Sequence, residues 1–298
     1  MTKANPTPRR VALAGASGTI GAAVLRRLEA EGHTVTAVPR AALADPDALA
    51  EVMDGAQPEV VISCIASRSG APRDAQAVDY EANVDLLAAA VAAGAGHFIL
   101  LSAICVQKPL LAFQRAKLAF EAELTASAMG YTIIRPTAFF KSLSGQAKRV
   151  AAGKPFLIFG DGALTRCKPI SDDDLARFIV GCIDAPEARG KVLPIGGPGP
   201  AITLKEQGEL LFRVAGKPAR FKSVSPRIFT LAERLLALGA PFSGWFAEKA
   251  EYARIARYYA TESMLVRDSA TGEYSAELTP EFGSETLESH YRRLLEGG

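Results

Sequence analysis

The sequence has few residues of the kinds that build metal centres, disulfide frameworks or hydrolytic triads. Its 298 residues include only four cysteines and three histidines, and these are scattered along the chain without a CxxC pair. Widely spaced cysteines in apolar surroundings are typical of reduced thiols. We therefore expect neither a metal site nor a histidine-based hydrolase triad.

Strong charge and long apolar runs are also missing. The formal net charge is +2, and no basic stripe is interleaved with aromatic residues, so nucleic acid is not an expected partner. Apolar residues make up 49% of the chain, but charges or glycines interrupt them before the about 18 to 20 consecutive positions that a spanning helix needs. Residues 1–10 are polar and contain no apolar secretory segment. These absences predict a cytoplasmic protein.

Short β-rich runs alternate with helical stretches rich in alanine and leucine through the first half of the chain. The expected strands are residues 10–14, 34–38, 60–65, 98–102 and 132–135, and the expected helices are 20–31, 79–93 and 117–127. This alternation is typical of an α/β fold with a doubly wound parallel sheet, that is, a Rossmann fold.

The alternation weakens after Phe139, and glycine and proline become frequent. A further helix at 172–182 and a strand at 191–195 are expected to return to the main sheet. We therefore assign residues 8–150, completed by about 171–195, to a nucleotide-binding core. Residues 151–170 and 196–298 are assigned to a smaller, mixed substrate-binding region packed on it.

Three glycines, Gly15, Gly18 and Gly21, stand between the first expected strand and the first expected helix. In a dinucleotide fold the first permits a tight turn, the second lets the backbone approach the pyrophosphate, and the third lets helix and sheet pack closely. The helix N-terminus attracts the phosphates. A glycine-rich turn without a ligand is the alternative, but the order of strand, glycines and helix favours a dinucleotide site.

Arg40 follows the second expected strand, and no carboxylate lies between Glu31 and Asp45. An acidic residue at this place binds the ribose hydroxyls of NAD, whereas an arginine accommodates the 2′-phosphate of NADP. The pattern predicts NADPH. A solvated loop arginine without a ligand is the alternative.

Phe113 and Lys117 occupy the positions of the Tyr-x-x-x-Lys pair of carbonyl-reducing short-chain dehydrogenases. A phenylalanine cannot protonate an alkoxide, so carbonyl reduction and sugar epimerisation lose their usual acid. Hydride delivery to a conjugated carbon-carbon double bond remains compatible with this pair. An ordinary helix lysine is the alternative.

Five long blocks, residues 97–121, 134–145, 167–171, 192–199 and 257–264, closely resemble the divinyl chlorophyllide a 8-vinyl-reductase family. The resemblance covers nearly all of the chain. It implies an atypical short-chain dehydrogenase that uses NADPH to reduce the 8-vinyl group of divinyl chlorophyllide a to an ethyl group, in chlorophyll or bacteriochlorophyll biosynthesis. It also implies a tetrapyrrole substrate. No obligate protein partner is evident from the sequence, and peripheral contact with photosynthetic membranes is an alternative that rests on residues 228–246.

The resemblance assigns roles to individual residues. Cofactor binding falls to Gly15, Ser17, Gly18, Thr19, Ile20, Gly21, Arg40, Ala66, Ser67, Arg68, Ser102, Ala103, Lys117, Pro136, Thr137 and Phe139. Lys117 is also the catalytic candidate, with hydride going to the outer vinyl carbon and a proton coming from solvent or a group positioned through Lys117. The substrate candidates are Ile104, Cys105, Lys108, Phe113, Phe140, Lys141 and Lys168. Ordinary core packing is the alternative for each aromatic.

The segment after Arg40 departs from the family, because it runs almost directly into Asp45. That leaves too little chain for a crossover and another strand. We expect the third edge strand to be shortened or absent.

Two further points stay open. Residues 228–246 carry apolar residues at helical spacing and the chain's one tryptophan, which suits either core packing, a cover for the pigment or a membrane surface. The rival functions are an isoflavone-reductase-like or quinone-type NADPH reductase, and a non-catalytic NADPH-binding regulator.

Overall fold

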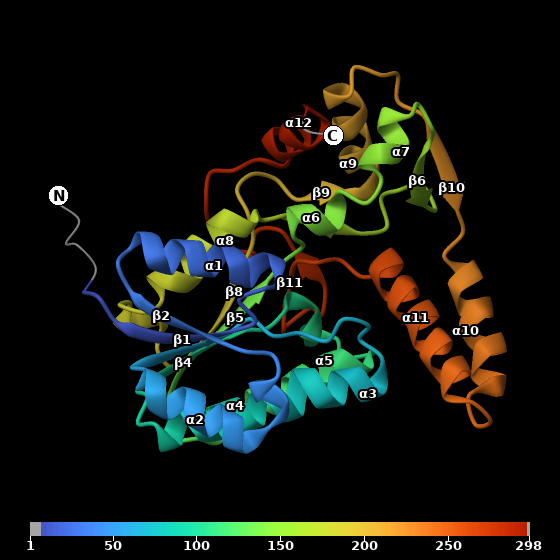
Figure 1. The fold of residues 1–298 in the computed structure, drawn as a ribbon. Coiled ribbons are helices and arrows are strands. Elements are labelled where there is room, and N and C mark those ends of the chain that lie inside the picture. Colours follow the sequence, from blue (N-terminus) through green and yellow to red (C-terminus); the bar gives the residue numbers. More distant parts are fainter. Residues whose placement is uncertain (1–6, 297–298) are drawn as a thin grey trace. The chain divides into compact units, whose positions relative to one another are not determined.

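The computed structural model describes residues 7–296, which divide into two compact units (Figure 1). The first contains the described residues up to Val106 together with Ala112–Arg135 and Leu175–Leu193. The second contains Gln107–Leu111, Pro136–Asp174 and the described residues from Pro194 onward. Residues 136–150, which we assigned to the nucleotide-binding core, therefore cluster with the second unit.

The first unit is built on a six-stranded sheet of order β2-β1-β3-β4-β5-β8, whose pairs from β2 to β5 are parallel. This confirms the expected doubly wound α/β fold. The strands are β1 (Arg10–Ala14), β2 (Thr34–Val38), β3 (Val60–Ser63), β4 (His97–Leu101), β5 (Gly130–Pro136) and β8 (Lys191–Ile195).

Helices cover both faces of this sheet, with α1 and α8 on one face and α2, α4 and α5 on the other (Figure 1). The helices are α1 (Thr19–Ala30), α2 (Pro46–Ala56), α3 (Pro72–Asp74), α4 (Ala82–Ala92), α5 (Ala112–Ala126) and α8 (Asp172–Gly181). Strand residues such as Val61 and Phe98 pack against Leu86 and Phe120 from the helices, and the Phe98 and Phe120 rings lie 5.8 Å apart. Burial of this apolar layer fixes the carboxyl ends of the strands, where ligands of such folds bind.

The expected loss of the third edge strand is confirmed, because β2 is the edge strand and no strand forms between Arg40 and Asp47. A 3₁₀ turn at Ala42–Ala44 leads instead into α2. Asp45 caps this helix by accepting hydrogen bonds from the Asp47 and Ala48 amides, and Pro46 occupies its first turn. We did not predict α2 as a helix, although an N-cap aspartate followed by proline is its usual start.

The second unit is a mixed assembly of short strands and helices around its own core. Strand β6 (Phe156–Phe159) pairs in parallel with β10 (Phe221–Val224). The pairs β7 (Arg166–Cys167) with β9 (Ile202–Thr203) and β11 (Val266–Arg267) with β12 (Tyr274–Ser275) are antiparallel. The helices are α6 (Phe140–Leu143), α7 (Ala147–Ala151), α9 (Leu204–Val214), α10 (Arg227–Gly239), α11 (Gly244–Thr261) and α12 (Leu287–Glu296).

The core of this second unit gathers Phe140, Phe156, Phe212 and Tyr291, all at most 2% exposed. Helix α9 begins with a capping box between Thr203 and Glu206, which fixes where the helix starts. No helix within residues 7–296 has the length and apolar character needed to cross a membrane.

Candidate functional site

The turn between β1 and α1 can form only with glycine at two positions. Gly15 has a φ of 83°, in the left-handed region, and a Cβ there would lie 2.8 Å from the backbone of Cys64. A Cβ on Gly21 would lie 2.0 Å from the Gly15 carbonyl oxygen. The Gly18 amide donates to that same oxygen at 3.0 Å. The three glycines therefore have the separate structural roles that a dinucleotide loop requires.

The start of α1 suits an anion. Gly18 is the N-cap residue and has no side chain to satisfy the first-turn amides, and no acidic residue stands in that turn. Ser17, Gly18 and Thr19 are exposed. The partial positive charge of a helix N-terminus is thus presented at the end of β1, which fits a pyrophosphate.

Arg40 follows β2 and is exposed, as the NADPH prediction requires. In the loop after β3, Ser69 donates through both its amide and its hydroxyl to Asp74, a carboxylate close enough to feel the charge of Arg40. Burial raises the pKa of Asp74, but the hydrogen bonds from Ser69 and the Arg68 amide, together with the charge of Arg40, bring that pKa below its ordinary value. Arg40 and the predicted contact Arg68 thus both follow carboxyl ends of strands, those of β2 and β3.

Lys117 forms a buried ion pair that the sequence did not reveal. Its ammonium nitrogen lies 2.9 Å from Oδ1 of Asp79, and the two side chains are 11% and 0% exposed. Phe113, half-buried, stands four positions earlier in α5 and so shares a helix face with Lys117. Lys117 is therefore a largely buried lysine whose ammonium group is fixed by an ion pair, rather than a solvated surface lysine.

Asp79 belongs to a π-helical turn, Ala75–Glu81, that precedes α4. Its Oδ1 also accepts from the Ser67 amide at 3.3 Å, whereas its Oδ2 is buried without a hydrogen-bond partner in the described structure. Inserted π turns often occur at functional sites, and a buried unpaired carboxylate oxygen calls for a specific explanation. The pair thus joins the loop after β3, where Ser67 lies, to the catalytic candidate.

Cys64 lies beside the same cation and is not an acid–base candidate. Burial raises the pKa of its thiol to about 12, although the charge of Lys117 lowers it. Ser102 is not an acid–base candidate either, because its hydroxyl donates a hydrogen bond to Glu121. Glu121 is a buried carboxylate that also forms an ion pair with Arg135. Neither Cys64 nor Ser102 is therefore an acid–base candidate beside the Lys117–Asp79 pair.

Two predicted substrate residues of the first unit are core residues in the structure. Ile104 and Cys105 are 2% and 5% exposed, and the Gln114 amide donates to the Cys105 carbonyl oxygen at 3.0 Å. Ala66 is exposed and Ala103 is half-buried, and each follows the carboxyl end of a strand.

The remaining predicted residues lie in the second unit. Pro136 and Thr137 are buried, and the Thr137 hydroxyl donates to the Lys168 carbonyl oxygen. Phe139 is half-buried and forms an isolated β-bridge with Ile170.

Phe140 is 2% exposed and packs in the core of the second unit, where its ring centroid lies 5.4 Å from that of His290. Core packing, the alternative for these aromatics, therefore describes Phe140.

The predicted cationic residues of the second unit differ in their surroundings. Lys168 is buried and its ammonium lies 2.6 Å from Glu281. Lys108 lies 2.7 Å from Glu262, which also accepts from the Tyr274 hydroxyl. Burial and that hydrogen bond raise the pKa of Tyr274, so it remains a donor. Lys141 is exposed on α6.

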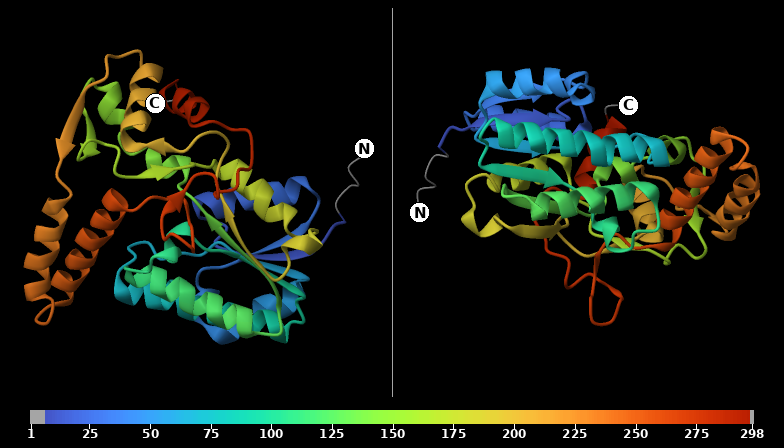
Figure 2. Two further views of the ribbon diagram at one scale, coloured as in Figure 1. Left: turned by 180° about the vertical axis from the view of Figure 1, so that it is seen from behind. Right: turned by 90° about the horizontal axis from the view of Figure 1, so that it is seen from below.

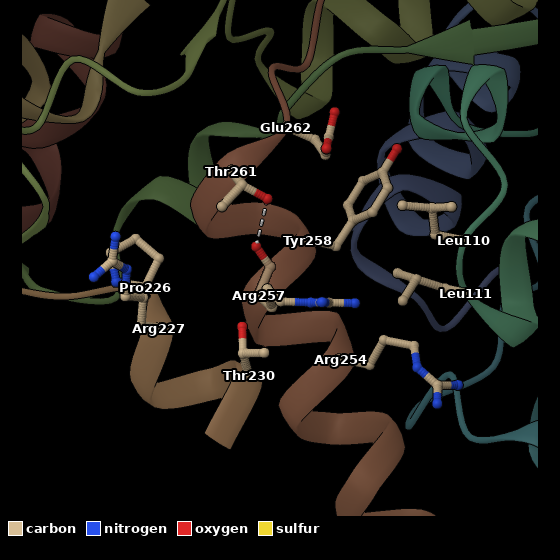
Figure 3. A pocket seen from close by; sticks show the side chains of 10 residues that line it. All are labelled: Leu110, Leu111, Pro226, Arg227, Thr230, Arg254, Arg257, Tyr258, Thr261 and Glu262. Carbon is tan, nitrogen blue, oxygen red and sulfur yellow. Dashed lines mark hydrogen bonds between the residues drawn. The ribbon is translucent and has the colours of Figure 1, made fainter. Parts of the chain in front are cut away.

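A pocket of ≈ 360 Å³ lies within the second unit, and our sequence analysis did not predict it (Figure 3). Helix α11 contributes Arg254, Arg257 and Tyr258, and Glu233 of α10 holds both arginines at 3.0 and 3.2 Å. The lining residues are Leu110, Leu111, Pro226, Arg227, Thr230, Arg254, Arg257, Tyr258, Thr261 and Glu262. The pocket therefore combines apolar walls with arginines.

Known proteins resemble this chain along nearly its whole length. A family model described as NAD(P)H-binding matches residues 40–186. The chloroplastic divinyl chlorophyllide a 8-vinyl-reductase of Oryza sativa subsp. indica is 47% identical over 98% of this chain and 80% of its own. That of Cucumis sativus is 44% identical over 99% of this chain and 78% of its own.

A solved structure supports the fold. The NADPH-dependent quinone oxidoreductase of Escherichia coli, solved with NADPH, matches with a TM-score of 0.66 over 95% of this chain and 99% of its own, at 20% identity. At that identity the likeness concerns the fold alone.

Proposed function

The chain belongs to the divinyl chlorophyllide a 8-vinyl-reductase family, and from that premise we propose that it uses NADPH to reduce the 8-vinyl group of divinyl chlorophyllide a to an ethyl group. The observation that carries this proposal is the 47% identity to the rice reductase over 98% of this chain. Phe113 in place of a phenolic acid agrees with reduction of a carbon-carbon double bond rather than a carbonyl.

The glycine loop is the proposed site for the cofactor's pyrophosphate. Its backbone fits, because a Cβ at Gly21 would collide with the Gly15 carbonyl and the exposed start of α1 has no capping side chain. Ser17, Gly18, Thr19 and Ile20 complete this cradle. A dinucleotide held by this loop would supply, from its nicotinamide ring, the hydride that the reduction needs.

Arg40 is the proposed contact for the 2′-phosphate that distinguishes NADPH from NADH. It is exposed at the end of β2, and no carboxylate between Glu31 and Asp45 offers the ribose contact of an NAD site. The loop residues Ala66, Ser67 and Arg68 and the strand-end residues Ser102 and Ala103 are the further contacts that we propose in the first unit.

Lys117 is the proposed catalytic cation. Asp79 holds its ammonium nitrogen at 2.9 Å, and burial of both side chains keeps competing water from the pair. A positively charged donor fixed in this way favours the negative charge that spreads over the conjugated macrocycle when the vinyl carbon is reduced. The proton that completes the ethyl group comes from solvent or from a group positioned through Lys117.

A turnover comparison tests the proposal. Purified protein is mixed with NADPH and either divinyl chlorophyllide a or a small quinone, and consumption of NADPH is followed by absorbance. We expect turnover with the pigment and little with the quinone. Turnover with quinones alone would support the quinone-type rival, and NADPH binding without turnover of either compound would support the regulator.

A further inference from the structure

Helix α10 exposes a stripe of large apolar side chains. Ile228, Leu231, Leu235 and Leu238 recur at helical spacing and are 55%, 59%, 60% and 74% exposed, and no residue of the helix is buried. A helix that packs in a core buries such a stripe. This stripe is therefore a surface, and the core-packing alternative for residues 228–246 does not describe it.

Three aromatic residues extend this surface, one in the turn between α10 and α11 and two in the first turn of α11. Phe242 is 89% exposed, Trp245 57% and Phe246 38%, and the last two rings meet edge to face at 5.0 Å. Ser243 accepts from the Trp245 amide and caps α11, so this turn is ordered by the chain itself. Helices α10 and α11 with the turn between them form a helical hairpin. We call its exposed apolar residues the hairpin patch: Ile228, Leu231, Leu235, Leu238, Phe242, Trp245 and Phe246.

The two helices are joined by contacts outside the exposed apolar stripe. Helices α10 and α11 lie side by side in Figure 1 and in both views of Figure 2, and they are in contact. Glu233 on α10 binds Arg254 at 3.0 Å and Arg257 at 3.2 Å on α11. The patch is thus available for a partner while the two helices stay joined.

Charge around the patch points to the partner's chemistry. Residues 235–247, at the end of the hairpin, contain no charged side chain. The charged residues within 220–249 are five cations and two carboxylates. One of the carboxylates, Glu233, forms ion pairs with Arg254 and Arg257. The five cations are Arg220, Lys222, Arg227, Arg234 and Lys249. Of these cations, Arg227 and Arg234 lie three or four positions from Leu231 on α10, and Lys249 lies 5.8 Å from the centroid of the Trp245 ring. An apolar surface with cations beside it complements an anionic lipid surface.

We propose that the hairpin patch inserts into the surface of a lipid bilayer that contains anionic lipids. Trp245 and Phe242 enter the boundary between headgroups and acyl chains, where aromatic side chains are favoured. Helix α10 lies in the plane of that boundary, since its 13 residues are too few to span a bilayer. A second copy of the chain is a less suitable partner, because two identical patches bring like charges together.

Trp245 makes the test direct, because it is the chain's one tryptophan and belongs to the patch. Full-length protein is titrated with vesicles of phosphatidylcholine, with and without phosphatidylglycerol, and tryptophan emission and vesicle flotation are followed. We expect a blue shift, protection from an aqueous quencher and flotation with the anionic vesicles, all weakened by salt. The assay contains neither NADPH nor pigment, so its result is independent of the proposed function.

Matched variants complete the experiment. Leu238→Glu and Phe242→Glu each place a charge in the patch and are expected to weaken partitioning at least about tenfold. Val91→Glu changes an apolar residue of α4 that is similarly exposed, at 54%, and is expected to leave partitioning unchanged. Absence of flotation in every lipid mixture would overturn the proposal. So would a dimer in solution that Phe242→Glu dissociates while lipid binding persists.

Discussion

The ammonium nitrogen of Lys117 lies 2.9 Å from Asp79 Oδ1, and the second oxygen of that carboxylate is buried without a hydrogen-bond partner in the described structure. The pair joins α5 to the π-helical turn before α4, and the Ser67 amide joins the same carboxylate to the loop after β3. Asp79 therefore positions the proposed catalytic cation and fixes the loop beside it.

Breaking this pair from one side is expected to destabilise the protein. Asp79→Leu leaves a nearly buried ammonium unpaired, at a cost of about 3–5 kcal/mol in the free energy of unfolding. Lys117→Met leaves the carboxylate unpaired with a comparable effect. The double variant removes both charges, and we expect it to recover most of the loss in urea unfolding. Additive losses in the double variant would show that the two side chains do not interact.

Gly21→Ala tests the steric basis of the glycine loop. The new Cβ would lie 2.0 Å from the Gly15 carbonyl oxygen, so the loop must move. We expect a loss of about 1–3 kcal/mol in stability and a raised KM for the cofactor. Gly55→Ala is the matched control, because that helical glycine has nothing within 4 Å of its Cβ position. It is expected to stabilise the protein by about 0.5–1 kcal/mol. Equal effects of the two changes would contradict the loop's role.

Arg40→Ala is expected to raise the KM for NADPH by roughly ten- to a hundredfold, because a charge-assisted contact to the 2′-phosphate is lost. The KM for NADH should change little. Arg73→Ala removes another exposed arginine of the first unit and should leave both values unchanged. Unaltered KM values for both NADPH and NADH after Arg40→Ala would show that Arg40 is a solvated loop residue.

His97 makes the stability of the first unit depend on pH. Thr132 donates its hydroxyl hydrogen to the Ala188 carbonyl, so it accepts from Nε2 of His97, while the buried Nδ1 has no described partner. Burial, followed by the charge of Arg189, lowers the pKa of His97 from 6.5 to about 4. A base with a lowered pKa contributes stability that is complete above its unfolded pKa and lost as the pH falls toward its folded pKa.

We therefore expect stability to fall by up to about 3 kcal/mol between pH 6.5 and pH 4 through His97 alone. Unfolding free energies of the wild type and His97→Gln, measured across that range, check this. The glutamine variant should have the flatter profile because it does not titrate. Parallel profiles would assign the acid sensitivity to other groups.

Local patterns predicted much of the first unit. Strands 10–14, 34–38 and 191–195 match the structure, and the shortened segment after Arg40 correctly predicted an absent edge strand. These features depend on short-range hydrophobic patterns and chain length. The start of α2 at Asp45 could have been predicted in the same way from its N-cap and proline.

Features that depend on long-range packing could not be predicted in this way. Asp79 was the first residue of an expected helix, and only the folded chain brings it to Lys117. The core positions of Cys105 and Phe140 likewise follow from tertiary packing, since a buried aromatic and a ligand-contacting one have the same sequence pattern. The pocket on α11 combines residues from three separate segments.

The most direct test of the central claim is the identity of the reaction product. Divinyl chlorophyllide a is incubated with NADPH and the wild-type protein, and the pigment is analysed by absorption and mass spectrometry. We predict a blue-shifted Soret band and a gain of two hydrogen atoms, with at least about tenfold slower conversion by Lys117→Ala at saturating cofactor. An unchanged pigment in the presence of bound NADPH would contradict the account.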